Sequence, residues 1–175
     1  MKNRMKLLSI LALAISALGT SAPAALAAPP SNDTFTDAKP VVVGDSDVID
    51  TTEATTDSDD AHLNDACGAP ATDASVWYAL DGSDTVVEVD VSQSSYSASI
   101  LVGVGSQGNL QPITCGSGGI VPEAFFALAG TTYYVLVIDD QGDGGDNGGI
   151  LSISFNEFPT TVDITGNRFG TVNRP

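Results

Sequence analysis

Short runs of alternating apolar and polar residues, separated by turns rich in Gly and Asp, constrain this chain more than any other feature. In TVVEVDV, residues 85–91, the last three valines alternate with Glu88 and Asp90, and LSISF, residues 151–155, alternates in the same way. Successive side chains of a strand point to opposite faces, so this pattern predicts strands with one face on a core and one in water. Runs of this β type occupy residues 41–43, 75–80, 85–91, 97–105, 123–129, 131–138 and 149–155.

The run YYVLVI, residues 133–138, lacks a polar face and is therefore expected to be a central strand that is covered on both sides. No segment after residue 27 shows a convincing helical stripe with capping residues, and the polar stretch at residues 55–68 is expected to be a loop. Seven short strands with Gly- and Asp-rich turns predict an all-β chain that forms a single antiparallel β-sandwich. A small open barrel is the alternative.

The first 27 residues have the features of a secretory signal peptide. MKNRMK carries three cations, LLSILALAISALG is an uncharged apolar core, and Ala25-Leu26-Ala27 offers a small-residue cleavage site. The apolar core is shorter than the roughly 20 residues that a membrane-spanning helix needs. We therefore expect a secreted, extracellular protein.

The charge of the chain excludes one class of partner. The formal charge is −16, and removing the three cations of the signal peptide leaves −19. Only Lys39, Arg168 and Arg174 remain as cations, so a surface that neutralises phosphate groups cannot be assembled. Polyanionic partners, namely nucleic acid and anionic membranes, are therefore not expected, and the acidity is interpreted as an aid to solubility outside the cell.

The residues after the signal peptide divide into a domain and a tail. Residues 28–158 are predicted to form the β-sandwich. Residues 159–175 offer one further strand-like run and are interpreted as a linker, a tail or the start of a truncated second β module. The two cysteines, Cys67 and Cys115, both lie in the domain, and an even count in an exported chain predicts a disulfide.

Catalytic signals in the sequence are weak. His62 is the only histidine, and no nucleophile motif accompanies it, so it is interpreted as a solvated loop residue. Trp77 is the only tryptophan and lies inside an alternating strand, which favours core packing over a sugar-binding platform. A glycosidase-like hydrolase that uses clustered carboxylates stays open as an alternative, because the separation of two carboxylates in space cannot be read from sequence.

Calcium is the metal that the acidic residues suit best, because it takes six to eight oxygen ligands. One candidate region is the acidic stretch with Asp57, Asp59, Asp60, Asn64 and Asp65. The other is DDQGDGGDNGG, residues 139–149, whose carboxylates belong to Asp139, Asp140, Asp143 and Asp146. Neither region matches an EF-hand loop. The alternative for residues 139–149 is a long hairpin connection that needs no metal.

Five short motifs follow one another in a recognisable order between residues 31 and 155. They are Asn32-Asp33-x-Phe35, Glu53-Ala54-Thr55, Ser75-Val76-Trp77-Tyr78, Gly130-Thr131-Thr132-Tyr133 and the Asp/Gly loop that runs into Leu151-Ser152-Ile153. Together they resemble the bacterial pre-peptidase C-terminal (PPC) domain. The resemblance implies a jelly-roll-like, non-catalytic β-sandwich of the kind appended to secreted peptidases and related to the collagen-binding domains of collagenases.

The resemblance also implies a calcium site. In the collagen-binding relatives an Asn-Asp pair joins carboxylates from the loop before the strand that resembles SVWY. Carried over to this chain, the implied ligands are Asn32, Asp33, Asp57, Asp59 and Asp60. The chain departs from the relatives at Ser31, where they place Glu, in its cysteine pair, and in the lack of an attached catalytic domain.

The expected function is that of a secreted, non-catalytic module for extracellular binding, adhesion or stability, stabilised by calcium and a disulfide. The expected partner is an extracellular protein or polysaccharide, and the module is expected to be a monomer. Two alternatives stay open: the small hydrolase described above, and an accessory fragment of a larger exported protein.

Overall fold

A computed structural model describes residues 28–69, 74–116, 122–141, 144 and 147–158. The predicted signal peptide (1–27) and tail (159–175) lie outside these residues. Within the described ranges no helix is both long and apolar enough to cross a membrane.

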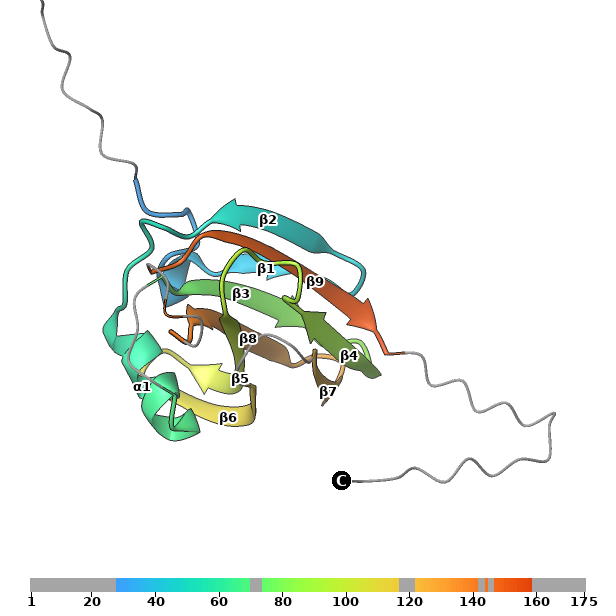
Figure 1. The fold of residues 1–175 in the computed structure, drawn as a ribbon. Coiled ribbons are helices and arrows are strands. Elements are labelled where there is room, and N and C mark those ends of the chain that lie inside the picture. Colours follow the sequence, from blue (N-terminus) through green and yellow to red (C-terminus); the bar gives the residue numbers. More distant parts are fainter. Residues whose placement is uncertain (1–27, 70–73, 117–121, 142–143, 145–146, 159–175) are drawn as a thin grey trace, which may run out of the picture.

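Two sheets pack face to face, which confirms the predicted single-domain β-sandwich (Figure 1). Sheet A has the order β1-β3-β8-β5-β6, and sheet B has the order β2-β9-β4-β7. All pairs are antiparallel except β1 with β3. The strands are β1 (Lys39–Val41), β2 (Ser46–Asp50), β3 (Val76–Asp81), β4 (Thr85–Asp90), β5 (Ala98–Ser106), β6 (Asn109–Gly116), β7 (Glu123–Ala127), β8 (Thr132–Asp139) and β9 (Ile150–Glu157).

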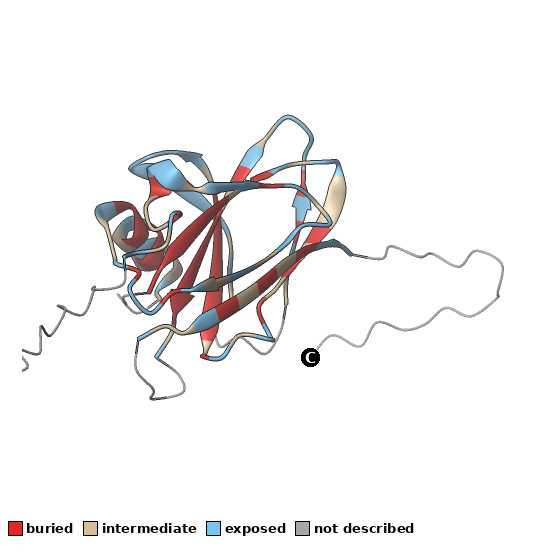
Figure 2. Cartoon of the chain, turned by 90° about the horizontal axis from the view of Figure 1, so that it is seen from above, coloured by how far each residue is buried: buried red, intermediate tan, exposed pale blue. Residues whose placement is uncertain are grey.

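Strand β8 occupies the centre of sheet A, as its doubly apolar pattern predicts. Tyr133, Val135 and Val137 face sheet B and belong to the core between the sheets. Leu136 and Ile138 face the other way, into a second apolar cluster on the outer side of sheet A. The outer cluster also contains Trp77 and is covered by two short helices, η1 (Phe35–Asp37) and α1 (Ser58–Cys67). Figure 2 shows buried residues both between the sheets and beneath α1.

The prediction that residues 55–68 form a loop is wrong, because α1 runs from Ser58 to Cys67. The helix begins with a capping box formed by Asp57 and Asp60, and it ends at Gly68, whose φ of 66° is the left-handed conformation typical of a helix C-terminus. Leu63 is the only large apolar side chain that the helix buries. The usual apolar stripe is therefore missing, although both end signals are present.

Two strands escaped prediction, and both lie at the edge of a sheet. Val48 of β2 is 69% exposed, and β6 buries only Leu110 while it carries Pro112. Proline is tolerated at sheet edges, where its missing N–H group is not needed. The loop at 139–149 also differs from expectation: it connects β8 of sheet A to β9 of sheet B, so it crosses between the sheets and is not a hairpin.

Candidate functional site: the acidic corner

The residues that the resemblance implies as calcium ligands are connected, through Trp77 and Thr55, to the region around the N-terminus of α1. The backbone N–H of Trp77 donates to the Asn32 carbonyl (2.8 Å), and the Asn32 amide donates to the Trp77 carbonyl (3.0 Å). The Trp77 indole N–H donates to the carboxylate of Asp60. We call Asn32, Asp33, Asp57, Asp59 and Asp60 the acidic corner.

Asp57 and Asp60 form the first turn of α1. The Asp57 carboxylate accepts from the N–H groups of Asp59 (2.7 Å) and Asp60 (3.1 Å), and the Asp60 carboxylate accepts from the Asp57 N–H (2.7 Å). The first N–H groups of a helix have no partner within the helix, and the positive end of the helix dipole favours acidic side chains there. Both carboxylates therefore act as caps for the helix.

Asp60 also ties the helix to strand β3 through Ser75. The Ser75 hydroxyl lies 2.6 Å from Oδ2 of Asp60 and 2.6 Å from the carbonyl oxygen of Thr55. A hydroxyl group has one proton, so it can donate to only one of these oxygens. Both contacts become hydrogen bonds when Asp60 is protonated and donates to Ser75, which then donates to Thr55.

The environment of Asp60 favours the protonated carboxyl group. The side chain is fully buried, and burial raises its pKa from 3.8 to about 6. Hydrogen bonds from Ser75, the Asp57 N–H and Trp77 oppose this rise, whereas the neighbouring charge of Asp57 adds to it. The pKa shift and the hydroxyl geometry thus point in the same direction.

Asp59 and Asp33 bind other parts of the chain. Asp59 accepts from the backbone N–H of Gly108 and from the side chain of Gln107, both at 2.9 Å, so it joins α1 to the turn between β5 and β6. Asp33 accepts from the N–H (2.7 Å) and hydroxyl (2.8 Å) of Thr55. Each carboxylate of the corner is therefore engaged with donors of the chain itself.

The predicted disulfide is confirmed and lies at the other end of α1. Cys67, the last residue of the helix, is bonded to Cys115 of β6. A small cavity of about 160 Å³ lies beside the disulfide, and its lining includes Ser99, Leu101 and Asp140. Among the described residues of this lining, Asp140 is the only carboxylate, and none of them is aromatic.

The second predicted calcium region is only partly described. The Asp139 side chain is buried and accepts from the N–H groups of Gln141 (2.8 Å) and Gly148 (2.7 Å), so it ties together the two ends of the loop. Asp140 accepts from the hydroxyl of Ser99 (3.0 Å). Asp143 and Asp146 lie outside the described residues.

The described residues do not assemble a group suited to a cation. Nowhere among them do three or more His, Cys, Asp or Glu side chains gather as metal ligands would. Two amides in this region are buried and incompletely bonded: Oδ1 of Asn32, and both polar atoms of the Asn64 side chain. Calcium binding stays a prediction from sequence, and the observed partners give the acidic corner a different role.

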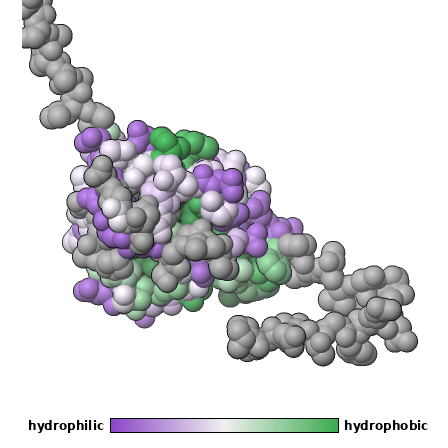
Figure 3. All heavy atoms as spheres, in the orientation of Figure 1, coloured by the Kyte–Doolittle hydropathy of each residue, from purple (hydrophilic) through white to green (hydrophobic). Residues whose placement is uncertain are grey.

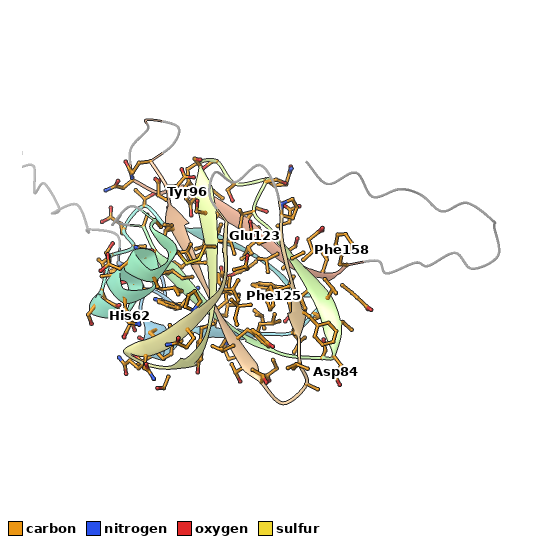
Figure 4. The ribbon with its side chains drawn as sticks, turned by 90° about the horizontal axis from the view of Figure 1, so that it is seen from below. His62, Asp84, Tyr96, Glu123, Phe125 and Phe158 are labelled. Atoms are coloured by element: carbon orange, nitrogen blue, oxygen red, sulfur yellow. A yellow bond between two sulfur atoms is a disulfide. The ribbon has the colours of Figure 1, made fainter. Side chains whose placement is uncertain are left out.

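The structure also gives the positions of the remaining residues that were considered for catalysis or binding. His62 is exposed on the surface of α1 (Figure 4). Trp77 is fully buried, which confirms the prediction of core packing. Tyr78, Tyr96 and Tyr133 are each at most 9% exposed, so these rings contribute little to the surface.

One surface feature was missed in the sequence. Phe126 of β7 pairs with Val86 of β4, and the N–H of Phe158 donates to the Val86 carbonyl on the other side (2.8 Å). These three side chains form a row across the outer face of sheet B, and Phe126, Leu128 and Phe158 are 53%, 54% and 42% exposed. We call these four residues the apolar row.

Figure 3 shows hydrophobic surface at the end of the molecule where the chain leaves β9, and Figure 4 places Phe158 there. The adjacent pair Phe125-Phe126 could have predicted an exposed aromatic ring. Adjacent residues of a strand point to opposite faces, so one of the two rings had to face outward.

Comparison with known proteins adds no assignment, because no family model and no curated protein matches the chain.

Proposed function

We propose that this chain is a secreted, non-catalytic β-sandwich module that binds an extracellular protein through the apolar row. The observation that carries the proposal is the cross-strand alignment of Phe126, Val86 and Phe158 on a solvent-facing sheet surface. Exposed apolar clusters with a polar border are typical of protein interaction sites, and aromatic side chains are enriched at their centres.

The surroundings of the apolar row define the chemistry of the partner. Glu88 follows on the same face of β4, and Asp84 lies just before β4, where its carboxylate accepts from the N–H of Ala129. Lys39 is the only Lys or Arg among the described residues, and it is paired with Asp47 at 2.8 Å. A partner surface with apolar side chains flanked by Lys or Arg is complementary to this arrangement.

Two observations favour a protein partner over a sugar. Sugar platforms use flat aromatic rings, whereas Trp77 and three of the four tyrosines are buried. The hydrolase alternative calls for a concave pocket with two facing carboxylates beside aromatic rings, whereas the described lining of the cavity beside the disulfide has one carboxylate and no ring.

Selection from a random peptide library displayed on phage tests the proposal, with the immobilised mature chain as bait. We expect the enriched peptides to contain apolar or aromatic residues flanked by Lys or Arg, and their binding to weaken at high salt. The double variant Phe126→Ser, Phe158→Ser is expected to reduce the affinity of these peptides at least tenfold, because central aromatic residues usually dominate an interface.

Matched controls come from exposed apolar residues elsewhere. Val48→Ser on β2 and Ile113→Ser on β6 remove comparable side chains, 69% and 46% exposed, outside the apolar row. Both controls should bind the selected peptides as the unmodified chain does. The proposal fails if no such peptides are enriched, if the double variant binds them unchanged, or if the chain instead binds cellulose or chitin.

A further inference from the structure

We infer that the acidic corner holds this end of the sandwich together without a calcium ion, because its carboxylates bind the chain's own N–H and O–H groups. The resemblance implies a cation at this place, joining the N-terminal segment to the loop before β3. In this chain the same connection is made directly: Asp33 binds Thr55, and the Thr55 carbonyl binds Ser75 at the start of β3.

The directions of the carboxylates oppose a shared ion. Calcium needs six to eight oxygen atoms that converge on one point at 2.3–2.6 Å. Asp59 instead reaches Gly108 at the tip of the β5–β6 turn, Asp60 reaches Trp77 and Ser75 beneath the helix, and Asp33 reaches Thr55. Together with the lack of a three-residue ligand group in the described ranges, this divergence indicates that the side chains do not fit the ion.

Other bonds already hold α1 in place, as a bridging ion would. Helix α1 is attached to the β5–β6 hairpin at both of its ends. Near its N-terminus Asp59 binds Gln107 and Gly108, and at its C-terminus Cys67 is bonded to Cys115. Between these ends Leu63 packs in the outer apolar cluster with Leu101 and Leu110 of the same hairpin.

Substitution of Asp59 separates a hydrogen-bond role from a metal-ligand role. Asparagine keeps an oxygen for the Gly108 N–H, and the Gln107 amide can turn its own oxygen toward the new NH2 group. Asparagine also keeps an oxygen that could bind calcium, but it lacks the negative charge by which a carboxylate strengthens that binding. We therefore expect Asp59→Asn to keep a Tm close to that of the unmodified chain, and Asp59→Ala to lower it by about 5 °C.

The experiment measures Tm of the oxidised mature chain and both variants in millimolar calcium chloride and in excess EDTA. We expect each protein to have the same Tm under the two conditions. A rise in Tm with calcium that both Asp59 variants abolish overturns the inference. A rise that survives both variants but is lost in Asp143→Ala supports it, because the ion then binds in the 139–149 loop. Peptide binding by the apolar row is a separate readout, so failure here leaves the proposed function standing.

Discussion

The buried carboxyl group of Asp60 gives this domain an unusual dependence of stability on pH. Burial raises the pKa of Asp60 from 3.8 to about 6 in the folded chain. The folded state therefore holds the proton more tightly than the unfolded state does. The contribution of Asp60 to stability is fully present below pH 3.8 and is lost as the pH rises through about 6, which is opposite to the usual behaviour of a carboxylate.

The magnitude follows from the difference between the two pKa values. About two pKa units correspond to about 3 kcal/mol in the free energy of unfolding, and about 2 kcal/mol of this should appear between pH 7.5 and pH 4. Relief of repulsion in a chain with a formal charge of −16 also stabilises the fold as carboxylates are protonated. The contribution of Asp60 must therefore be measured as a difference between two proteins.

Asp60→Asn supplies that difference. The amide can donate to Ser75 and accept from the Trp77 indole, as the protonated carboxyl group does, and it loses only the bond from the Asp57 N–H. We expect its stability at pH 7.5 to stay within about 1 kcal/mol of the unmodified chain. On acidification the unmodified chain should gain about 2 kcal/mol more than the variant.

Urea unfolding at pH 4, 5, 6 and 7.5 measures this difference, and the fluorescence of Trp77, the only tryptophan, reports directly on the acidic corner. Asp50→Asn is the control. Asp50 is exposed, and its hydrogen bonds with Thr52 lower its pKa, so removing it should leave the extra gain on acidification intact. If the free energy of unfolding changes equally with pH in the unmodified chain and in Asp60→Asn, then Asp60 does not bind the extra proton.

Two further predictions concern bonds between distant elements. Cys67→Ser with Cys115→Ser should lower the free energy of unfolding in urea by about 4 kcal/mol, since the disulfide spans 48 residues, and a loss below about 1 kcal/mol would contradict the chain-entropy argument. Tyr133→Phe should cost about 1 kcal/mol in the same assay, because the Tyr133 hydroxyl accepts from the Leu128 N–H and donates to the Phe126 carbonyl at the end of β7. An unchanged midpoint for Tyr133→Phe would show that water replaces both bonds without loss.

The sequence predicted those strands whose positions are dictated by burial. Strands β4 and β9 present apolar residues to the core at every second position, and only one register hides them, whereas β8 is apolar on both faces. Strands β2 and β6 lie at sheet edges, where only one neighbouring strand supplies hydrogen bonds. Many of their side chains face solvent and need not be apolar. Their positions depend on tertiary pairing, which leaves no periodic signal.

The residues of the acidic corner could be predicted from the sequence, but their long-range contacts could not. Asp57 and Asp60 have the three-residue spacing of a capping box, and Gly68 is a suitable helix end, so α1 could have been predicted from its two ends. The bond from Gly108 to Asp59 joins residues 49 positions apart, and no local pattern reports it. The cysteines were predictable as a pair because there are only two.

Binding and stability should be separable in this domain because they depend on opposite ends of it. The helix α1, whose first turn belongs to the acidic corner, lies at one end of the sandwich, and β9 ends at the other (Figure 1). Figure 4 places Phe158, the residue after β9, at that far end. Substitutions at distant sites without shared partners usually have additive effects. Phe126→Ser should therefore weaken peptide binding without changing the response to pH, and Asp60→Asn should change that response without weakening binding. Coupling between the two would mean that strain passes from α1 along β8 to Tyr133, whose hydroxyl contacts the end of β7.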